Sequence, residues 1–380
     1  MKSLFEHFEI LEDPRDIRGK KYELINILIL TIYGILCGYT DFTNMTDFLK
    51  LNEEYFNNLL SLKNGIPSHD CFSRVFSIMD SKEFIKLFIE WIKNIVYDNK
   101  GRFLSIDGKA IKSATDKING GNTPYIVSAF LNEMGISIGQ VKVNNKSNEI
   151  TVIPELLDLI DISGLFVTID AIGTQTNIAN KIIDKKGNYI LKVKTNQRDL
   201  LDDIKTYFDI EISNDNSEID YIDTEFENDH GRIERREYYI SYNTSFINNK
   251  NKWKNLSAVG MMKCYREEKT KITIKEHYYI IYILLVKKIN IETFRDATRS
   301  HWNIECCLHW KLDVILDEDH STNKKGNSIE NISTIRKIVF NLAKLDKSMG
   351  EKLTLNQKIT RYNHDFKNIE NLFFHVIPSL

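Results

Sequence analysis

Two stretches decide the fold: RFLSID at residues 102–107 and LFVTID at residues 165–170. Each is a short, mostly apolar run that ends in an aspartate, a pattern typical of a buried β-strand followed by a loop. Residues 125–131, YIVSAFL, and residues 136–143, ISIGQVKV, predict two more strands joined as a hairpin. Residues 188–195, NYILKVKT, predict a fifth strand.

Helical patterns separate the later strands. Residues 150–162 and 177–186 have the apolar spacing of helices, so the elements follow the order β-β-β-α-β-α-β. A three-stranded antiparallel meander, followed by strands joined through helices, gives a mixed sheet with helices on its faces. The sequence therefore predicts an α/β fold at the centre of the chain.

Helices are expected before this centre. Residues 24–39, LINILILTIYGILCGY, predict a buried helix that is too short to span a bilayer. Ser68 is suited to cap the next clear helix, and residues 84–95 repeat the apolar spacing of a helix. Such helices are compatible with a DNA-binding helix-turn-helix and equally with a structural bundle.

The later part of the chain predicts strands and then helices. Residues 201–290 are rich in alternating Tyr and Ile, which favours strands. A helix is expected from about Asn290 through Glu305, and a last one over residues 329–345. We therefore predict a helical N-terminal domain at residues 1–97, a core at 98–200 and 291–350, a β-rich insertion at 201–290 and a C-terminal tail at 351–380.

The composition is that of an ordinary globular protein, with 380 residues, 42% hydrophobic and 27% charged. Five cysteines without a C-x-x-C pair argue against a secreted disulfide scaffold and against a cysteine-based zinc site. The opening residues, MKSLFEHFEILEDPRD, carry acids where a signal peptide would be apolar. We therefore expect a cytoplasmic protein.

The net charge of −2 conceals an asymmetry along the chain. Residues 199–229 contain twelve acids and one base, so this segment carries −11 and the rest carries +9. Residues 181–198, just before it, carry +5. Basic surface beside a site can neutralise phosphates, but charge runs are also typical of solvated faces, so both interpretations stay open.

Asp107 and Asp170 end the two deciding stretches. If these strands are neighbours in one sheet, both carboxylates emerge at similar positions along it. Carboxylates on rigid strands suit Mg²⁺, which prefers oxygen ligands and keeps waters for a substrate phosphate. Alternatively, each aspartate caps the loop after its strand, which is a frequent use of this residue.

A third acid, Glu305, lies in RSHWNIECCLHWKLDV at residues 299–314. On a helix, His301, Glu305 and His309 share one face, which permits a zinc site. Glu305 could instead complete a magnesium site with the two aspartates, or form an ion pair with Arg299 or His309. Zinc would leave both aspartates unexplained, so we favour magnesium.

A family resemblance joins these observations. The segments LSIDGKAIKS, VTIDAIGTQTNIANKI, YILKVKTNQ, HGRIERR and RSHWNIECCLHWKLDVILDED resemble the DDE-type insertion-sequence transposases of the H-repeat-associated family. DPRDIRGKKYEL and GIPSHDCFSRVF extend the resemblance over nearly the whole chain. The resemblance implies an RNase H-like core in which Asp107, Asp170 and Glu305 are the catalytic residues and bind Mg²⁺, with Mn²⁺ as a substitute.

The same resemblance implies an activity, namely metal-dependent DNA cleavage and strand transfer at the ends of the insertion sequence. The implied partners are double-stranded DNA, as terminal inverted repeats and target DNA, and a second copy of the chain on the DNA ends. The implied location is the cytoplasm, at the nucleoid and without a membrane. The alternatives are a two-metal endonuclease without strand transfer and a catalytically silent DNA-binding relic.

Several basic and aromatic residues are candidate DNA contacts, although each basic one is equally typical of plain surface. Trp302 and Trp310 could stack on a flipped base or pack in a core. His301 and Lys311 flank Glu305, near where the wider group of transposases places basic residues. The candidate DNA-binding residues are Lys109, Lys112, Lys192, Lys194, Arg198, His230, Arg232, Arg235, Arg236, His301, Trp302 and Lys311.

Overall fold

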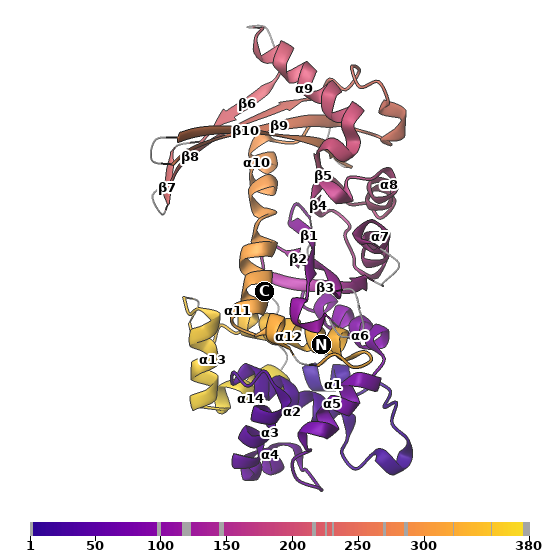
Figure 1. The fold of residues 1–380 in the computed structure, drawn as a ribbon, viewed down its shortest axis with the longest axis vertical. Coiled ribbons are helices and arrows are strands. Elements are labelled where there is room, and N and C mark those ends of the chain that lie inside the picture. The colour runs from indigo at the N-terminus through magenta and orange to yellow at the C-terminus, as the bar shows by residue number, and fades with distance from the viewer. Residues whose placement is uncertain are drawn as a thin grey trace.

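The structure is a computed structural model that describes residues 3–96, 100–115, 123–143, 148–214, 218–224, 226–229, 232–268, 271–284, 288–321, 323–350 and 352–374. Figure 1 shows an elongated molecule with helices at one end, a sheet in the middle and an arm of long strands at the other end. Among the described residues, no helix combines the length and the apolar character that a membrane span requires.

The central sheet has the predicted mixed topology. Its strands are β1 (Phe103–Ala110), β2 (Tyr125–Leu131), β3 (Ile136–Val143), β4 (Phe166–Ile169) and β5 (Asn188–Val193). They lie in the order β3-β2-β1-β4-β5, antiparallel from β3 to β1 and parallel from β1 through β4 to β5. This is the RNase H-like α/β arrangement, so the predicted fold class is confirmed.

Helices cover both faces of this sheet. On one face, α7 (Glu149–Leu159) contacts β2 and β3 while α8 (Thr176–Asp184) contacts β5. On the opposite face lies α10 (Ile291–Ser300), whose Phe294 packs with Phe166 of β4 and Ile190 of β5. The side chain of Ile106 in β1 belongs to the core on the α7 face. Successive side chains of a strand point to opposite faces, so Asp107 points to the face that carries α10.

The inserted segment extends the same sheet. It contains α9 (Arg198–Ile212), β6 (Asp220–Asp223), β7 (Glu227–Asp229), β8 (Arg232–Ser241), β9 (Ala258–Glu268) and β10 (Lys271–Tyr282). Because β10 pairs antiparallel with β5, ten strands of the described residues form one sheet. We call β6 to β10 the arm, and Figure 1 shows it projecting beyond the core.

A helical unit lies at the other end of the molecule. It contains α1 (Leu4–Phe8), α2 (Leu24–Leu36), α3 (Phe42–Leu51), α4 (Glu53–Leu60), α5 (His69–Ile78) and α6 (Ser81–Lys93). All 13 residues of α2 are buried, as its continuous apolar run predicts. The side chain of Ser68 accepts a hydrogen bond from Cys71 N–H at 3.3 Å, which confirms the predicted cap of α5.

Two later parts of the chain tie this unit together. The 18-residue helix α12 (Ser328–Leu345) contacts α2, α5, α6 and β3, so it joins the helical unit to the sheet. The described part of the predicted C-terminal tail forms α13 (Leu355–His364) and α14 (Lys367–Phe374). The ring of Phe373 stacks on that of Tyr33 in α2, with centroids 4.8 Å apart. The domain boundaries themselves stay a prediction.

Candidate active site

Asp107 and Asp170 lie side by side in the parallel register. The register pairs Ile106 of β1 with Ile169 of β4, and each aspartate is the next residue in its chain. One expectation needs correction, because β1 does not end at Asp107. β1 remains paired with β2 as far as Ala110, whereas its parallel neighbour β4 ends at Ile169. Asp107 therefore has no strand residue beside it on the β4 side, and the space there is open.

Asp170 both caps a turn and lines a cavity. Its Oδ1 accepts a hydrogen bond from Ala171 N–H at 2.5 Å and lies 3.4 Å from Lys194 Nζ. Burial raises the pKa of Asp170, but the Ala171 hydrogen bond and the positive charge of Lys194 outweigh it, so the pKa lies below its usual value. Asp170 is therefore ionised at neutral pH.

The pKa of Asp107 is shifted in the direction opposite to that of Asp170. Burial first, and then the negative charges of Glu305, Glu149 and Asp170, raise the pKa of Asp107 to about 7 against the opposing hydrogen bond from Gly108 N–H. A divalent cation among these carboxylates would relieve their repulsion. The donor set, made of carboxylate oxygens, therefore fits Mg²⁺ or Mn²⁺.

Glu305 is carried by an unusual helical turn. The expected helix through Glu305 instead ends at Ser300, a π-helical turn spans Ile304–His309, and α11 (Trp310–Val314) follows. A π-turn closes hydrogen bonds between residues five apart, so side chains four apart no longer align as they would on an α-helix. Single π-turns within helices occur frequently at functional sites.

The two histidines around Glu305 contact different strands. His301 Nδ1 lies 3.0 Å from Thr168 Oγ1 on β4, and His309 Nδ1 lies 3.5 Å from Asp107 Oδ2 on β1. Burial lowers the pKa of His301 to about 4 and that of His309 to about 3, so both rings are neutral at neutral pH. These contacts position the helix and Asp107.

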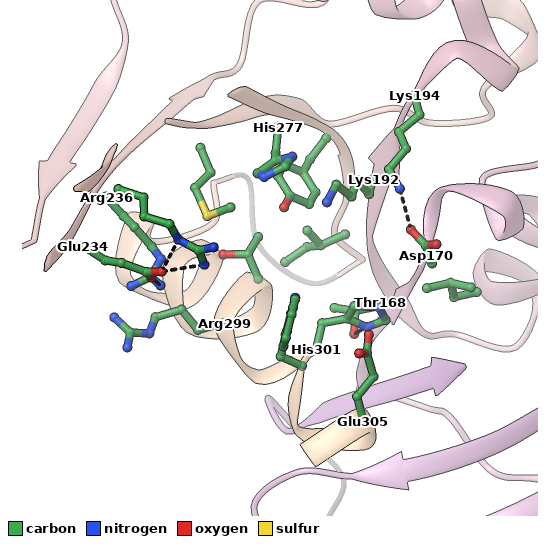
Figure 2. A pocket seen from close by; sticks show the side chains of 17 residues that line it. Thr168, Asp170, Lys192, Lys194, Glu234, Arg236, His277, Arg299, His301 and Glu305 are labelled. Carbon is green, nitrogen blue, oxygen red and sulfur yellow. Dashed lines mark hydrogen bonds and ion pairs between the residues drawn. The ribbon is translucent and has the colours of Figure 1, made fainter. Parts of the chain in front are cut away.

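The two histidines of the zinc alternative contact different strands. Within the part of the chain that the structure describes, no three His, Cys, Asp or Glu side chains form a ready-made metal cluster, and this holds for Asp107, Asp170 and Glu305 as it does for the histidines. The alternative ion pair of Glu305 with Arg299 is not formed in that part either, because Arg299 Nη1 pairs with Glu227 Oε1 at 2.5 Å. Figure 2 shows Glu305 directed toward Thr168, on the strand that leads to Asp170.

A cavity of about 540 Å³ opens beside Asp170 and Glu305, between the core and the arm, and Asp107 is not among the residues that line it. Asp170 and Glu305 line it from the core side, and Arg236 lines it from β8 of the arm (Figure 2). Lys192 and Lys194 line the same cavity from the segment around β5. The cavity thus places anionic metal-ligand candidates next to cations that suit a phosphate backbone.

Three further candidates, two of them in this cavity, are at least partly exposed. Burial and the charge of Lys194 lower the pKa of Lys192, and among the described residues no acid forms an ion pair with Lys192. Trp302 lines the cavity and is 63% exposed, so it is not a core residue. Trp310 is 53% exposed, which likewise excludes the core interpretation.

Lys109 needs a correction as a DNA contact. Its ammonium forms an ion pair with Asp313, lies 2.7 Å from Glu318 Oε2 and lies 3.9 Å from Asp319 Oδ1. Its side chain is only 11% exposed. Lys109 therefore neutralises buried acids below the site and is not available to a phosphate.

The arginines of the arm are paired with acids. Arg235 Nη2 lies 3.0 Å from Glu237 Oε1, and Arg235 also pairs with Asp223. Arg236 Nη1 lies 2.9 Å from Glu227 Oε2. A phosphate would therefore compete with carboxylates for these two guanidinium groups.

The remaining candidates lie away from the 540 Å³ cavity. Lys112 and Arg198 are exposed, and Arg198 Nε lies 3.8 Å from Asp202 Oδ2. Lys311 lines a separate cavity behind the π-turn. His230 lies outside the described residues, and of Arg232 only the backbone, in β8, is described.

Sequence reasoning missed three features of this site. It did not find the contact between His309 and Asp107, nor the proximity of Glu149 to Asp107. It also missed a buried polar cluster in which Lys337 Nζ donates to Gln140 Oε1 at 2.6 Å. The acids of LDVILDED, which include Glu318, were a usable signal for a buried cation partner.

Comparisons with known proteins identify the family of the chain. A sequence model described as the transposase DDE domain matches residues 98–342, and a model for a segment associated with that domain matches residues 5–92. YncI of Escherichia coli O157:H7, which carries the name of a transposase, is 38% identical over 90% of this chain and 87% of its own.

Two more similarities extend this finding. YhhI of Escherichia coli K12, which carries the name of an H repeat-associated transposase, is 33% identical over 91% of this chain and 92% of its own length. Among solved structures, a piggyBac transposase synaptic complex with hairpin DNA is similar at a TM-score of 0.45 and 13% identity. That similarity covers 95% of this chain and 74% of the other.

Proposed function

The chain belongs to the transposase DDE domain family, and we propose that it catalyses metal-dependent DNA cleavage and strand transfer at the ends of its own insertion sequence. One observation carries the proposal. Asp107 and Asp170 occupy adjacent register positions on parallel strands, and Glu305 faces those strands from a helix on the same side of the sheet.

The proposed catalytic residues are Asp107, Asp170 and Glu305. They would hold Mg²⁺ or Mn²⁺ ions, which when bound activate a water or a 3′-hydroxyl and stabilise the leaving oxygen of a phosphodiester. The chain's own groups prepare this site. Ala171 N–H and Lys194 hold Asp170 ionised, and the ring of His309 lies 3.5 Å from the carboxylate of Asp107.

Lys192, Lys194 and Trp302 are the proposed substrate contacts at the reacting phosphate. Lys192 and Lys194 bring positive charge beside Asp170, and Trp302 offers an exposed aromatic face in the same cavity. We propose terminal inverted repeats and target DNA as the bound duplexes. A second copy of the chain would bring the two ends together.

A joining assay tests the proposal. The protein is incubated with a labelled duplex that carries the element end, a supercoiled target plasmid and Mg²⁺, with Asp107→Ala as the matched control. Joined products with the parent protein and none with the variant support transposition. Nicks without joining would indicate the nuclease alternative. Equal DNA binding by both proteins, without any cleavage, would indicate the silent relic.

A further inference from the structure

A second cavity lies on the other side of the helical stretch that carries Glu305. It has a volume of about 530 Å³ and lies between α11, the end of α12 and the first turn of α13. Trp310 and Lys311 line it from α11, Lys344 from α12 and Asn356 from α13. Figure 1 shows α13 beside α11, on the side of the molecule toward which the arm projects.

Of the four lysines that line this cavity, Lys311 and Lys344 lie next to each other. The pKa of Lys311 is lowered first by burial and then by repulsion from the adjacent ammonium of Lys344. Among the described residues, no acid forms an ion pair with either lysine. Two adjacent like charges, one on the half-buried Lys311 and one on the exposed Lys344, favour an anion between them.

The acid that lines the cavity is already engaged. Asp346 Oδ2 accepts a hydrogen bond from the Tyr362 hydroxyl at 2.6 Å, and its Oδ1 accepts from Ser348 N–H at 2.8 Å and from the Ser348 hydroxyl at 2.6 Å. Lys358 is also engaged, because its ammonium donates to the backbone carbonyl of Ala343 at 2.7 Å. Lys311 and Lys344 therefore contribute positive charge to the cavity, and Lys347 lines it as well.

The other walls favour the same ligand. Trp310 is 53% exposed and presents an aromatic face beside the lysines. Leu355 and Asn356, in the first turn of the ten-residue helix α13, lie at the positive end of its dipole. The walls thus combine positive charge with a surface for a sugar or base.

We propose that this cavity binds a backbone phosphate of the DNA strand whose reacting phosphate lies at Asp107, Asp170 and Glu305. The inference rests on the proposed function. Glu305 and Lys311 are six residues apart, so they lie at most about 9 Å apart along the helix axis, because an α-helix rises about 1.5 Å per residue and a π-turn rises less. Along the axis of a duplex, where one strand has a phosphate about every 3.4 Å, a span of about 9 Å corresponds to about two to three nucleotides. The exposed Trp302 and Trp310 lie along the same stretch.

A salt series tests the phosphate contact. The variant Lys311→Ala/Lys344→Ala is compared with Lys250→Ala/Lys252→Ala, which removes the same charge from exposed positions in the 3₁₀ turn Lys250–Lys252 of the insertion. Affinity for the element-end duplex is measured from low to high salt. We expect the cavity variant to bind roughly tenfold more weakly and to lose about one to two from the slope of log K against log salt. The control should keep the parental slope.

The outcomes separate the cavity from the proposed function. If the parent joins DNA and the cavity variant keeps the parental slope, the cavity inference is overturned while the proposed function stands. If the parent neither binds nor joins the element end, the proposed function fails first. Lys344→Ala alone, which truncates an exposed side chain, repeats the test if the double variant misfolds.

Titration with inorganic phosphate separates two sources of the same chemistry. Weak binding of inorganic phosphate, lost in the double variant together with the DNA salt slope, supports a backbone phosphate as the ligand. Loss of inorganic phosphate binding with an unchanged DNA slope would mean that the cavity takes a free anion, which overturns the DNA assignment.

Discussion

At the scale of single residues, Asp107 has the most unfavourable electrostatic environment among the proposed catalytic groups. It is largely buried, it is close to three other carboxylates, and its pKa rises to about 7. Asp170 is held ionised by Ala171 N–H and Lys194. The free protein therefore keeps one carboxylate whose charge is unfavourable until a cation arrives.

Replacing Asp107 by Asn tests this electrostatic conflict. Without metal at pH 8, Asp107→Asn should unfold about 2–4 °C higher than the parent, because it removes one of the repelling charges. Adding Mn²⁺ should raise the unfolding temperature of the parent but not that of the variant. Calorimetry with and without Mn²⁺ measures both effects, and a variant that Mn²⁺ stabilises as much as the parent would contradict the assignment.

We expect His309 to affect the affinity for metal through its contact with Asp107, and not by contacting DNA. His309→Ala removes the ring that lies 3.5 Å from the Asp107 carboxylate, so Mn²⁺ affinity should fall about 10–100-fold. His320→Ala is the matched control, because His320 is exposed and pairs with Asp317 instead. Isothermal titration with Mn²⁺ decides the point, and equal affinity in both variants would leave His309 without this role.

At the scale of elements, the π-turn Ile304–His309 sets the direction of Glu305. The π-turn interrupts the α-helical winding between α10 and α11. The His301–Thr168 contact anchors the chain at the end of α10, and the buried Leu312 anchors α11. A π-turn contains one residue more than an α-turn, so the extra residue rotates the preceding part of the helix relative to α11. The turn is therefore a specific requirement for aiming Glu305.

Deleting Cys306 should abolish activity while keeping the fold. The deletion lets the segment wind as an α-helix and turns Glu305 by about 100° relative to α11. Joining should fall at least about a hundredfold, since small misplacements of catalytic groups carry costs of that size. Cys306→Ala keeps the spacing and removes only an exposed thiol, so it should join DNA like the parent. Activity in the deletion variant would show that the turn is dispensable.

At the scale of the whole molecule, a buried charge cluster connects the site to the helical unit. Glu318 contacts Lys109 of β1, and Ser333 of α12 donates to Glu318 Oε1 at 2.8 Å. Because α12 also packs against α2, α5 and α6, the cluster links the strand of Asp107 to the far end of the protein.

Removing the charge of Glu318 should destabilise the protein strongly. Burial raises the pKa of Glu318, but Lys337, Lys109 and Arg336 outweigh it and hold the pKa at about 2. The ionised group therefore contributes stability above about pH 4.5 that is lost as the pH falls toward 2. Glu318→Gln should cost about 3–5 kcal/mol at pH 7, because it leaves buried cations uncompensated.

Urea unfolding at several pH values measures this effect. The gap between the parent and Glu318→Gln should shrink as the pH falls from about 4.5 toward 2. Asp319→Asn is the control, because Asp319 lies 3.9 Å from Lys109 and should cost less than about 1 kcal/mol. A gap that stays constant over this pH range would mean that the charge of Glu318 is not the source of its effect.

The sequence predicted those features that depend on local pattern. The apolar runs of β1 to β5 were identifiable because a buried strand leaves a short signature. The assignment of Asp107, Asp170 and Glu305 as metal ligands came from the family resemblance and stays a prediction. Lys109 could not be classified, since its partners are more than 200 positions away in the chain. The π-turn was also hidden, because it depends on how both ends of the helix are anchored.

The most direct test of the central claim is a crystal structure of the protein with an element-end duplex and Mn²⁺, measured at a wavelength that gives anomalous signal from manganese. We predict anomalous peaks between the carboxylates of Asp107, Asp170 and Glu305, next to a DNA phosphate. Manganese bound elsewhere, or Glu305 turned away from β1 and β4 in that complex, would contradict the account.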